Sequence, residues 1–289
     1  MKILKVSDFF LSERHAFSLF DMNRQSLEDV HRHEFDELVI VRHGSGFHII
    51  NDQVEFIHKG DFFIVSANDV HCYESTNKLS ITNILLHKAR PFHFIHHISQ
   101  LTAGIHQHTS PLKKRRAGLT NEELDKITEL TEKMNALCDA VYDDSYFATA
   151  ESYLLSMIVM MFQCARRREC RTSHADSGKR HLLNYLRENY TCNINWDYLC
   201  EESGVAKRTM FRFIKEITGF TPEKFQQRYR LLKTQELLRT SDLTIGKIAR
   251  LCGFSATSRL TEAYKKQFNR TPSQERMRVS NSVIETVHQ

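Results

Sequence analysis

The stretch LCEESGVAKRTMFRFIKEITGFTP, residues 199–222, decides the fold, because a second stretch of the same design follows about fifty residues later. The second stretch, residues 248–272, reads IARLCGFSATSRLTEAYKKQFNRTP. Each begins with an apolar helix, turns at a glycine followed by an apolar residue, continues into a helix rich in Lys and Arg, and stops at Thr-Pro. This order of features is typical of a helix-turn-helix, present here twice. Two such units can place two helices in successive major grooves, so the sequence predicts sequence-specific DNA binding.

The second helix of each unit should carry the side chains that reach the DNA. The first of these helices is predicted from Lys207 to about Thr218, and the other from near Ala256. Apolar residues would form their core-facing sides: Met210, Phe211, Ile214 and Ile217 in the first copy, and Leu260, Ala263, Tyr264 and Phe268 in the second. The predicted DNA-binding residues are Lys207, Arg208, Thr209, Arg212, Lys215, Thr257, Ser258, Arg259, Thr261 and Lys265.

Arg208 and Arg212 lie one helical turn apart and are expected to contact bases, because an Arg guanidinium can donate two hydrogen bonds to guanine O6 and N7. Any single Lys or Arg on such a surface is more often a phosphate contact. Between the two copies, Pro222 to Thr240 predicts one long helix, with the proline in its first turn. A rigid helix there would hold the second reading helix about one turn of DNA, roughly 34 Å, from the first.

The charge along the chain separates two regions. Residues 179–289 hold 20 Lys and Arg against 11 Asp and Glu, whereas residues 1–178 hold 20 against 24. A basic carboxyl-terminal region is expected where a protein contacts phosphates. Composition then divides the chain into a first domain at 1–165, to which effector binding and dimerisation are assigned below, a polar linker at 166–181, the basic DNA-binding domain at 182–280 and a tail at 281–289.

Cysteine usage and hydropathy favour a cytoplasmic protein. The seven cysteines include no C-x-x-C pair, and the start of the chain lacks an apolar core long enough for a signal peptide. We therefore expect reduced thiols. The longest apolar stretch, Tyr153 to Phe162, is too short to cross a bilayer and predicts a buried helix, with no membrane partner.

Short apolar runs separated by turn residues predict β-structure from about Leu38 to Leu86. Asn51-Asp52 and His43–Gly46 are both interpreted as turns, and strands of this length suggest a sandwich or barrel. A predicted capping box at Thr120 then opens a helical region. Its apolar stripes are Leu124, Ile127, Leu130, Met134 and Leu137, followed by Tyr153, Leu154, Met157, Ile158 and Met161. Two roles stay open for these stripes: packing on the β domain, or contact with a second subunit.

A set of polar residues lies at the start of the β region. His31, His33 and Glu37 are separated by even steps, so on an extended chain they can point into the same cavity. His71 arrives from another strand and completes a set of four groups. With Tyr73 they are the predicted effector-binding residues, and Phe47, Phe62 or Tyr73 could supply an apolar face. The first interpretation is hydrogen bonding to an organic effector without a cofactor; the alternative is a metal site of His31, His33, Glu37 and His71.

The carboxyl-terminal third, from about Trp196 to Arg278, resembles the DNA-binding domain of the AraC/XylS family of bacterial transcription regulators. The residues that carry the resemblance are Gly204, Lys215, Thr218-Gly219, Thr221-Pro222, Arg230-Leu231, Leu237-Leu238, Ile245, Ile248-Ala249, Cys252-Gly253-Phe254, Tyr264-Lys265 and Thr271-Pro272. Arg259-Leu260 replaces the family's usual aromatic pair, Asn269 the usual glycine and Thr234 the usual alanine. The first of these departures falls on the predicted base-reading surface.

The amino-terminal part resembles the two cupin motifs through His31, His33 and Glu37, then Gly60-Asp61 and His71. Within the AraC/XylS family, the segments His33–His48, His71–Glu74 and Leu79–Ile84 resemble regulators of rhamnose operons. The fold class implied is α+β multidomain: a cupin-like β-barrel with a helical extension, then an all-α double helix-turn-helix.

The resemblance implies a transcription activator and not an enzyme. Its expected partners are promoter DNA, RNA polymerase, a second copy of the chain and a small effector, with a monosaccharide such as L-rhamnose as the first guess. Two alternatives stay open. One is a regulator that responds to a protein partner or to no ligand. The other is a metal-binding cupin fused to a DNA-binding module.

Overall fold

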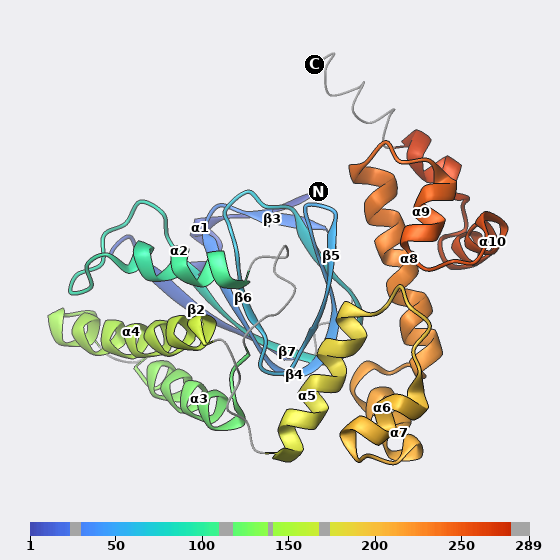
Figure 1. The fold of residues 1–289 in the computed structure, drawn as a ribbon. Helices are drawn as coiled ribbons and strands as arrows, with labels where there is room; N and C mark the ends of the chain where they lie inside the picture. Colours follow the sequence, from blue (N-terminus) through green and yellow to red (C-terminus); the bar gives the residue numbers. More distant parts are fainter. Residues whose placement is uncertain (24–29, 110–117, 138–140, 168–173, 279–289) are drawn as a thin grey trace. The chain divides into compact units, whose positions relative to one another are not determined.

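Seven strands form one curved sheet in the amino-terminal part of the chain (Figure 1). They are β1 (Lys2–Leu4), β2 (Phe17–Asn23), β3 (His31–His33), β4 (Asp36–Ile50), β5 (Gln53–His58), β6 (Phe62–Val65) and β7 (His71–Leu86). The long strands β4 and β7 pair antiparallel with each other. Each also changes partners along its length: β4 pairs with β5 and β6, and β7 with β2 and β3. The sheet therefore curls around its own core, as a cupin-like barrel requires.

The structure, a computed structural model, describes residues 1–23, 30–109, 118–137, 141–167 and 174–278. The chain divides into two units. One is formed by Met1–Asn51 and Ile57–Ser177, and the other by Gly178–Gln289 with the short segment Asp52–Phe56. The predicted tail at 281–289 lies outside the described residues, as do Cys138 and Cys170. The other five cysteines are free thiols.

Strand β4 runs continuously through His43–Gly46, so the turn predicted there is wrong. Its pairing with β7 instead shifts register three times between Val41 and Phe47. Irregularities of this kind bend a strand without ending it. Gly44 has a φ of 71°, and a Cβ there would lie 2.3 Å from the backbone oxygen of Asn77. The glycine therefore marks a close approach between two bent strands, not a chain reversal.

The other predicted turn, Asn51-Asp52, does join β4 to β5. Both residues have left-handed backbone, with φ of 47° and 63°. Two consecutive positive φ values are what a two-residue hairpin turn needs if its twist is to match the flanking strands. Asn and Asp tolerate this conformation better than most residues, which is why the sequence signal was reliable here.

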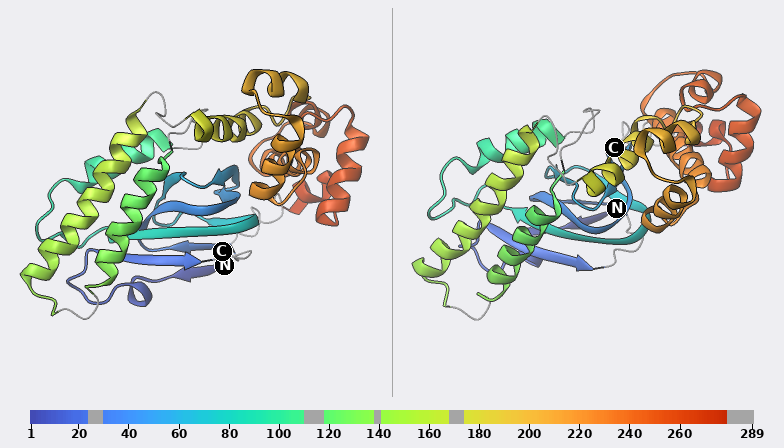
Figure 2. Two further views of the ribbon diagram at one scale, coloured as in Figure 1. Left: turned by 90° about the horizontal axis from the view of Figure 1, so that it is seen from below. Right: turned by 60° about the horizontal axis from the view of Figure 1, so that its bottom comes forward.

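Helices α2 (Ile98–Thr109), α3 (Asn121–Asn135) and α4 (Asp144–Arg166) share one apolar core with the sheet, while α1 (Val6–Phe9) is a single short turn. Figure 2 shows α3 and α4 lying side by side. The predicted stripe of α3 faces this core: Leu124 and Ile127 are buried, and the partly buried residues packed against them include Leu130, Met134 and Leu137. Packing on the β domain is therefore confirmed for this stripe. The predicted capping box is present as well, with the Thr120 hydroxyl accepting from the backbone N–H of Glu123.

Helix α4 is long and apolar enough to cross a membrane, judged by length and composition alone. Four of the five residues of its predicted stripe lie in the core instead, Leu154, Met157, Ile158 and Met161, while Tyr153 is half-buried outside it. Glu151, only 1% exposed, accepts hydrogen bonds from the backbone N–H groups of His93, Phe94 and Ile95 at 2.7, 2.8 and 3.0 Å. A buried carboxylate that fixes a neighbouring loop belongs to the core helix of a folded domain.

The second unit is helical. Its helices are α5 (His174–Glu188), α6 (Trp196–Ser203), α7 (Lys207–Thr218), α8 (Pro222–Thr240), α9 (Ile245–Leu251) and α10 (Thr257–Phe268), and residues 272–278 are also helical. In Figure 1, α6 and α7 lie at the start of α8, and α9 and α10 lie at its end. The predicted bounds of both reading helices and of the long connecting helix are confirmed. The 19 residues of α8 span about 28 Å at 1.5 Å per residue.

Helix α5 begins at His174, inside the segment 166–181 that composition predicted as linker. The apolar residues that anchor α5 come later, at Leu182, Leu183 and Leu186, all of them buried. A helix can extend beyond its packed part into polar sequence, and composition does not reveal such an extension. Residues 168–173 of the predicted linker lie outside the described residues.

Candidate nucleic-acid interface and ligand pocket

The two helix-turn-helix units expose most of the predicted DNA-binding side chains. Nine of the ten are exposed: Lys207, Arg208, Thr209, Arg212, Lys215, Thr257, Ser258, Arg259 and Lys265. The tenth, Thr261, is half-buried, and its hydroxyl donates to the backbone oxygen of Thr257 at 3.0 Å. Thr261 is therefore poorly placed to read a base, because part of its surface is buried and its hydroxyl already donates a hydrogen bond within the helix.

Each helix buries the apolar side that the sequence predicted. Met210 and Ile214 are buried on α7, and Leu260 and Tyr264 on α10. Two exposed ion pairs involve the predicted contact residues: Lys207 Nζ lies 2.9 Å from Asp197 Oδ1, and Arg259 Nη1 lies 3.9 Å from Glu262 Oε2. Exposed pairs of this kind contribute about 0–1 kcal/mol, so either basic side chain can leave its partner for a phosphate.

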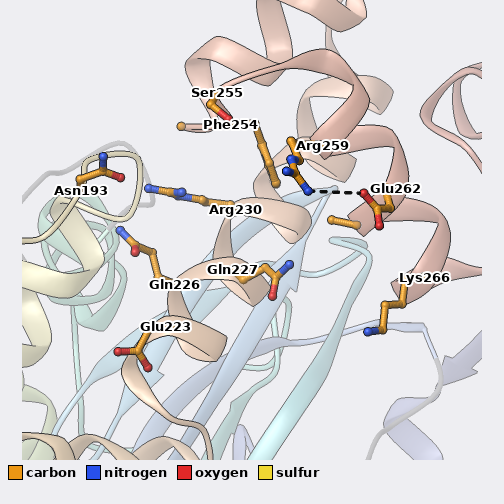
Figure 3. A pocket seen from close by; sticks show the side chains of 12 residues that line it. Asn193, Glu223, Gln226, Gln227, Arg230, Phe254, Ser255, Arg259, Glu262 and Lys266 are labelled. Carbon is orange, nitrogen blue, oxygen red and sulfur yellow. Dashed lines mark ion pairs between the residues drawn. The ribbon is translucent and has the colours of Figure 1, made fainter.

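Helices α8 and α10 enclose a groove of about 650 Å³ (Figure 3). Arg259, Glu262 and Lys266 line one side of it from α10, and Gln226, Gln227 and Arg230 line the other from α8. Arg230 has a structural task, because its guanidinium donates to the backbone oxygens of Tyr190, Thr191 and Cys192 at 2.7, 3.2 and 3.0 Å. Glu262 was not among the predicted contact residues, since the sequence search looked for basic and hydroxyl groups.

The first unit contains a cavity of about 280 Å³. Four of the five predicted effector residues line it: His31, Glu37, His71 and Tyr73. Its other lining residues are Lys2, Leu4, Phe9, Phe20, Met22, Phe35, Asn83 and Leu85. Of the three residues suggested as an apolar face, Tyr73 lines the cavity and Phe47 and Phe62 do not; Phe9, Phe20 and Phe35 form the rest of the aromatic wall. The sequence missed this wall because α1 and β2 lie outside the region of regular β pattern.

Strand pairing brings the polar residues together. His31 on β3 is the register partner of His71 on β7, and their ring centroids are 4.3 Å apart. Glu37 extends from β4, where Asn83 Nδ2 donates to its Oε1 at 2.6 Å. Its other oxygen, Oε2, lies 3.8 Å from the Nε2 atoms of both His33 and His71. Asn83 was not predicted, because a lone Asn inside a strand carries no recognisable pattern.

His33, fully buried behind the cavity, has a defined tautomer. Its Nδ1 lies 2.5 Å from the backbone oxygen of Phe35. A carbonyl oxygen only accepts, so Nδ1 carries the proton and Nε2 of the neutral ring is an acceptor. Burial lowers the pKa of His33 and outweighs the hydrogen bond to Phe35, which acts in the opposite direction. The ring is therefore neutral near pH 7.

His71 is held from behind by a second buried imidazole. Its Nδ1 lies 3.1 Å from Nε2 of His48. The His48 ring is itself stacked on Phe63 and Tyr73, with centroid distances of 4.6 and 5.0 Å. Burial, reinforced by the neighbouring imidazoles, lowers the pKa of His71 well below its ordinary value, so this ring too is neutral near pH 7.

Three of these residues, His33, Glu37 and His71, could also hold a metal ion. One ligand atom each from His33, Glu37 and His71 lies within 4.8 Å of the others. Two imidazole nitrogens and a carboxylate suit a divalent transition metal. The other polar atom of each group is hydrogen-bonded: His33 Nδ1 to the backbone oxygen of Phe35, Glu37 Oε1 to Asn83, and His71 Nδ1 to His48. Such partners are how proteins orient metal ligands. The donor set therefore fits either an organic effector or a metal ion, but the metal site would have three of the four predicted ligands, because His31 is not part of this group.

Comparison with known proteins agrees with both units. A helix-turn-helix domain model matches residues 199–278, and a cupin domain model matches residues 19–84. With the full-length relatives described next, these matches show that the chain belongs to the AraC/XylS family of DNA-binding transcription regulators.

The HTH-type transcriptional activator RhaS of Pectobacterium carotovorum is 30% identical, covering 94% of this chain and 96% of its own length. RhaS of Mannheimia succiniciproducens is 29% identical, covering 95% of this chain and 98% of its own. Among solved structures, an AraC-type transcriptional regulator from Chromobacterium violaceum is 26% identical, covers 36% of this chain and 94% of that one, and has a TM-score of 0.33.

Proposed function

We propose that the chain is a transcription activator whose amino-terminal cavity binds a small polyhydroxylated effector, and whose two reading helices contact promoter DNA. Arg208 and Arg212 of α7 would donate to guanine, and Lys215 and Lys265 would contact phosphates. Their exposure on the faces opposite the buried cores supports this assignment. The relatives are named transcriptional activators, which supports activation over repression.

The observation that carries the effector proposal is a carboxylate, Glu37, at the wall of an aromatic cavity, next to the acceptor nitrogen of the buried His33. Glu37 Oε2 and the acceptor nitrogen of His33 lie 3.8 Å apart, too far to bond each other. Two acceptors in this arrangement suit a ligand that brings its own donors, as a sugar hydroxyl does. The cavity's phenylalanines offer the apolar surface that a sugar ring needs. L-rhamnose is the first candidate, on the sequence resemblance to regulators of rhamnose operons.

Effector binding would favour a domain arrangement suited to DNA, with differential affinity supplying the free energy. The chain would recruit RNA polymerase, act in the cytoplasm, carry out no reaction of its own and bind a second copy of itself. The subunit contact is expected away from Leu124 and Ile127, which are buried within their own chain. Sedimentation of the full-length protein tests the dimer; a strict monomer well above cellular concentration contradicts it.

A divalent metal ion held by His33, Glu37 and His71 is the second candidate for this cavity, favoured by the spacing of the three ligand atoms. Metal analysis of the purified protein, followed by chelation, separates the candidates. Stoichiometric metal whose removal lowers thermal stability favours the metal site. A metal-free protein that is stabilised by a sugar favours the effector pocket.

Thermal stability of the full chain with and without L-rhamnose and its stereoisomers tests the effector proposal. A ligand at about 100 times its Kd should stabilise the protein by about 2.7 kcal/mol. Glu37→Gln and Glu37→Ala should each remove this stabilisation, because they leave buried polar groups unpaired at a cost of about 1–3 kcal/mol. Glu122→Gln, at an exposed position of α3, is the matched control and should respond like wild type.

Three results would contradict the proposal in different ways. A folded Glu37→Ala protein that responds at the original sugar concentration would mean that Glu37 and His33 only satisfy each other. Stabilisation by no sugar at all would exclude the sugar class. Loss of the response in Glu122→Gln as well would mean that the loss reflects general instability, not the pocket.

A further inference from the structure

The two reading helices can be compared position by position, because they share one framework. Both α7 and α10 are twelve residues long and end at a residue with left-handed backbone, Gly219 in one and Asn269 in the other. A Thr-Pro pair follows each, with the proline buried. The buried residues Met210 and Ile214 correspond to Leu260 and Tyr264, fifty positions later. An offset of fifty therefore relates equivalent positions on the two helices.

On each helix, one position points most directly away from the buried side. At 100° per residue, the direction opposite the buried pair is occupied by Arg212 on α7 and by Glu262 on α10. Both are exposed, and the Glu262 side chain has 77% of its surface accessible. The neighbouring outward position is Arg208 on α7 and Ser258 on α10. Two arginines in the first copy therefore correspond to a serine and a carboxylate in the second.

Glu262 has no evident structural task. It lines the groove between α8 and α10 with Arg259 and Lys266 (Figure 3). Its pair with Arg259, 3.9 Å apart and exposed on both sides, adds little to stability. The pair does, however, leave the carboxylate beside two cations on a surface that faces polyanionic DNA. A carboxylate there is repelled by phosphates unless it meets a hydrogen-bond donor.

In the major groove, donors are offered by cytosine N4 and adenine N6, and Glu pairs best with cytosine because it can only accept. From the proposed role of the two reading helices, we infer that Glu262 is a base-reading residue of the second helix-turn-helix unit and that it selects a cytosine. Arg212 at the equivalent position of the first unit selects a guanine. Arg259 and Lys266 would screen the carboxylate from nearby phosphates. The two units would thus read different bases through one framework.

Selection of binding sites from a random DNA library by the full-length protein tests the inference. Wild type should yield a cytosine in the second block of the site, and replacing that base should weaken binding about tenfold to hundredfold. Glu262→Gln keeps the size of the side chain but adds a donor, so the cytosine preference should fall and adenine should gain. Glu223→Gln is the matched control: this glutamate lines the same groove from α8 and should leave every preference unchanged.

Four other outcomes would overturn the inference. Glu262→Gln could bind all sequences more tightly with the same base preferences, which would mean that Glu262 only repels phosphates. Glu223→Gln could change the same preference, which would point to the charge of the groove as a whole. Conserved bases only in the part of the site read by the first helix-turn-helix would overturn the inference about Glu262 and leave the proposed function unaffected. A wild-type selection with no conserved block would contradict that function as well.

Discussion

The first helix-turn-helix unit and the second have nearly the same backbone and different chemistry. Helices α7 and α10 have equal lengths, similar buried positions and the same Thr-Pro exit. Their outward faces carry Arg208 and Arg212 in one case and Ser258 and Glu262 in the other. Caps and core constrain the fold, while the outward face carries no packing requirement. A duplicated unit can therefore keep its fold while its base preference diverges.

The same contrast occurs inside the units, at the third residue after each Thr-Pro pair. Phe225 stands there in the first unit and Glu275 in the second, and each is 1% exposed. Glu275 bonds the guanidinium groups of Arg239, at 2.9 Å, and Arg270. One unit therefore closes its core with an aromatic ring and the other with a buried ion cluster. The two units should respond differently to mutation and to pH.

The largest expected effect is that of Phe225→Ala, which should destabilise the first unit by about 3–5 kcal/mol through lost burial and a cavity. Urea unfolding followed by Trp196 fluorescence reports on this unit, because Trp196 is the only tryptophan and its ring lies 5.0 Å from that of Phe211. Amide exchange should show a greater loss of protection in α7 than in α10. Equal losses would mean that the two units unfold as one and that the contrast between them is false.

Glu275 should make the second unit sensitive to acid. Burial alone would raise the pKa of Glu275, but hydrogen bonds from Arg270 and Arg239 outweigh it and hold the pKa below its ordinary value. A lowered folded pKa gives stability that is fully present above the unfolded value and is lost as pH falls through the folded value. Glu275→Gln should cost about 1.5–3 kcal/mol at neutral pH. Urea unfolding followed by circular dichroism at neutral pH and in acid should show this difference shrinking in acid; a constant difference would contradict the ion cluster.

Arg208→Ala and Arg212→Ala should each weaken specific binding by about 1–3 kcal/mol and relax the preference at one or two base pairs. Ser258→Ala, at the position equivalent to Arg208, should cost less because a hydroxyl makes one weaker contact. Fluorescence anisotropy with a selected site and with random DNA measures both quantities. If either arginine variant lost affinity equally for the two DNAs, base reading by that arginine would be wrong.

The smallest effect is expected where the two units agree. Lys215 and Lys265 occupy equivalent exposed positions. Replacing either by alanine should weaken binding uniformly across sequences and reduce the slope of log affinity against log salt by about 0.9. Titrations at several salt concentrations give the slope. A change in sequence preference, or an unchanged slope, would show that one of these lysines does not contact a phosphate.

The sequence predicted most of the helical carboxyl-terminal part of the chain because its signals are local. Helix-end signals, glycine turns and apolar residues at spacings of three and four predicted the bounds of α7, α8 and α10 closely. The amino-terminal sheet depends on long-range pairing, so β1 and β2 were missed and a bend at Gly44 was mistaken for a turn. The extended chain predicted at His31 and His33 is present as β3. The same reason explains Asn83 and Phe20, which strand pairing brings to the cavity, whereas Phe9 reaches it from α1. Glu262 was not among the predicted contacts, which were limited to basic and hydroxyl side chains.

The central claim is that two helix-turn-helix units in one chain each read their own part of the DNA. Selection of sites from a random library by the full-length protein tests it most directly, with Arg212→Ala and Glu262→Ala selected in parallel. We expect two conserved blocks about 10 base pairs apart. Arg212→Ala should weaken the base preference in the first block only, and Glu262→Ala in the second only. A single conserved block, or a loss of both blocks in either variant, would contradict it.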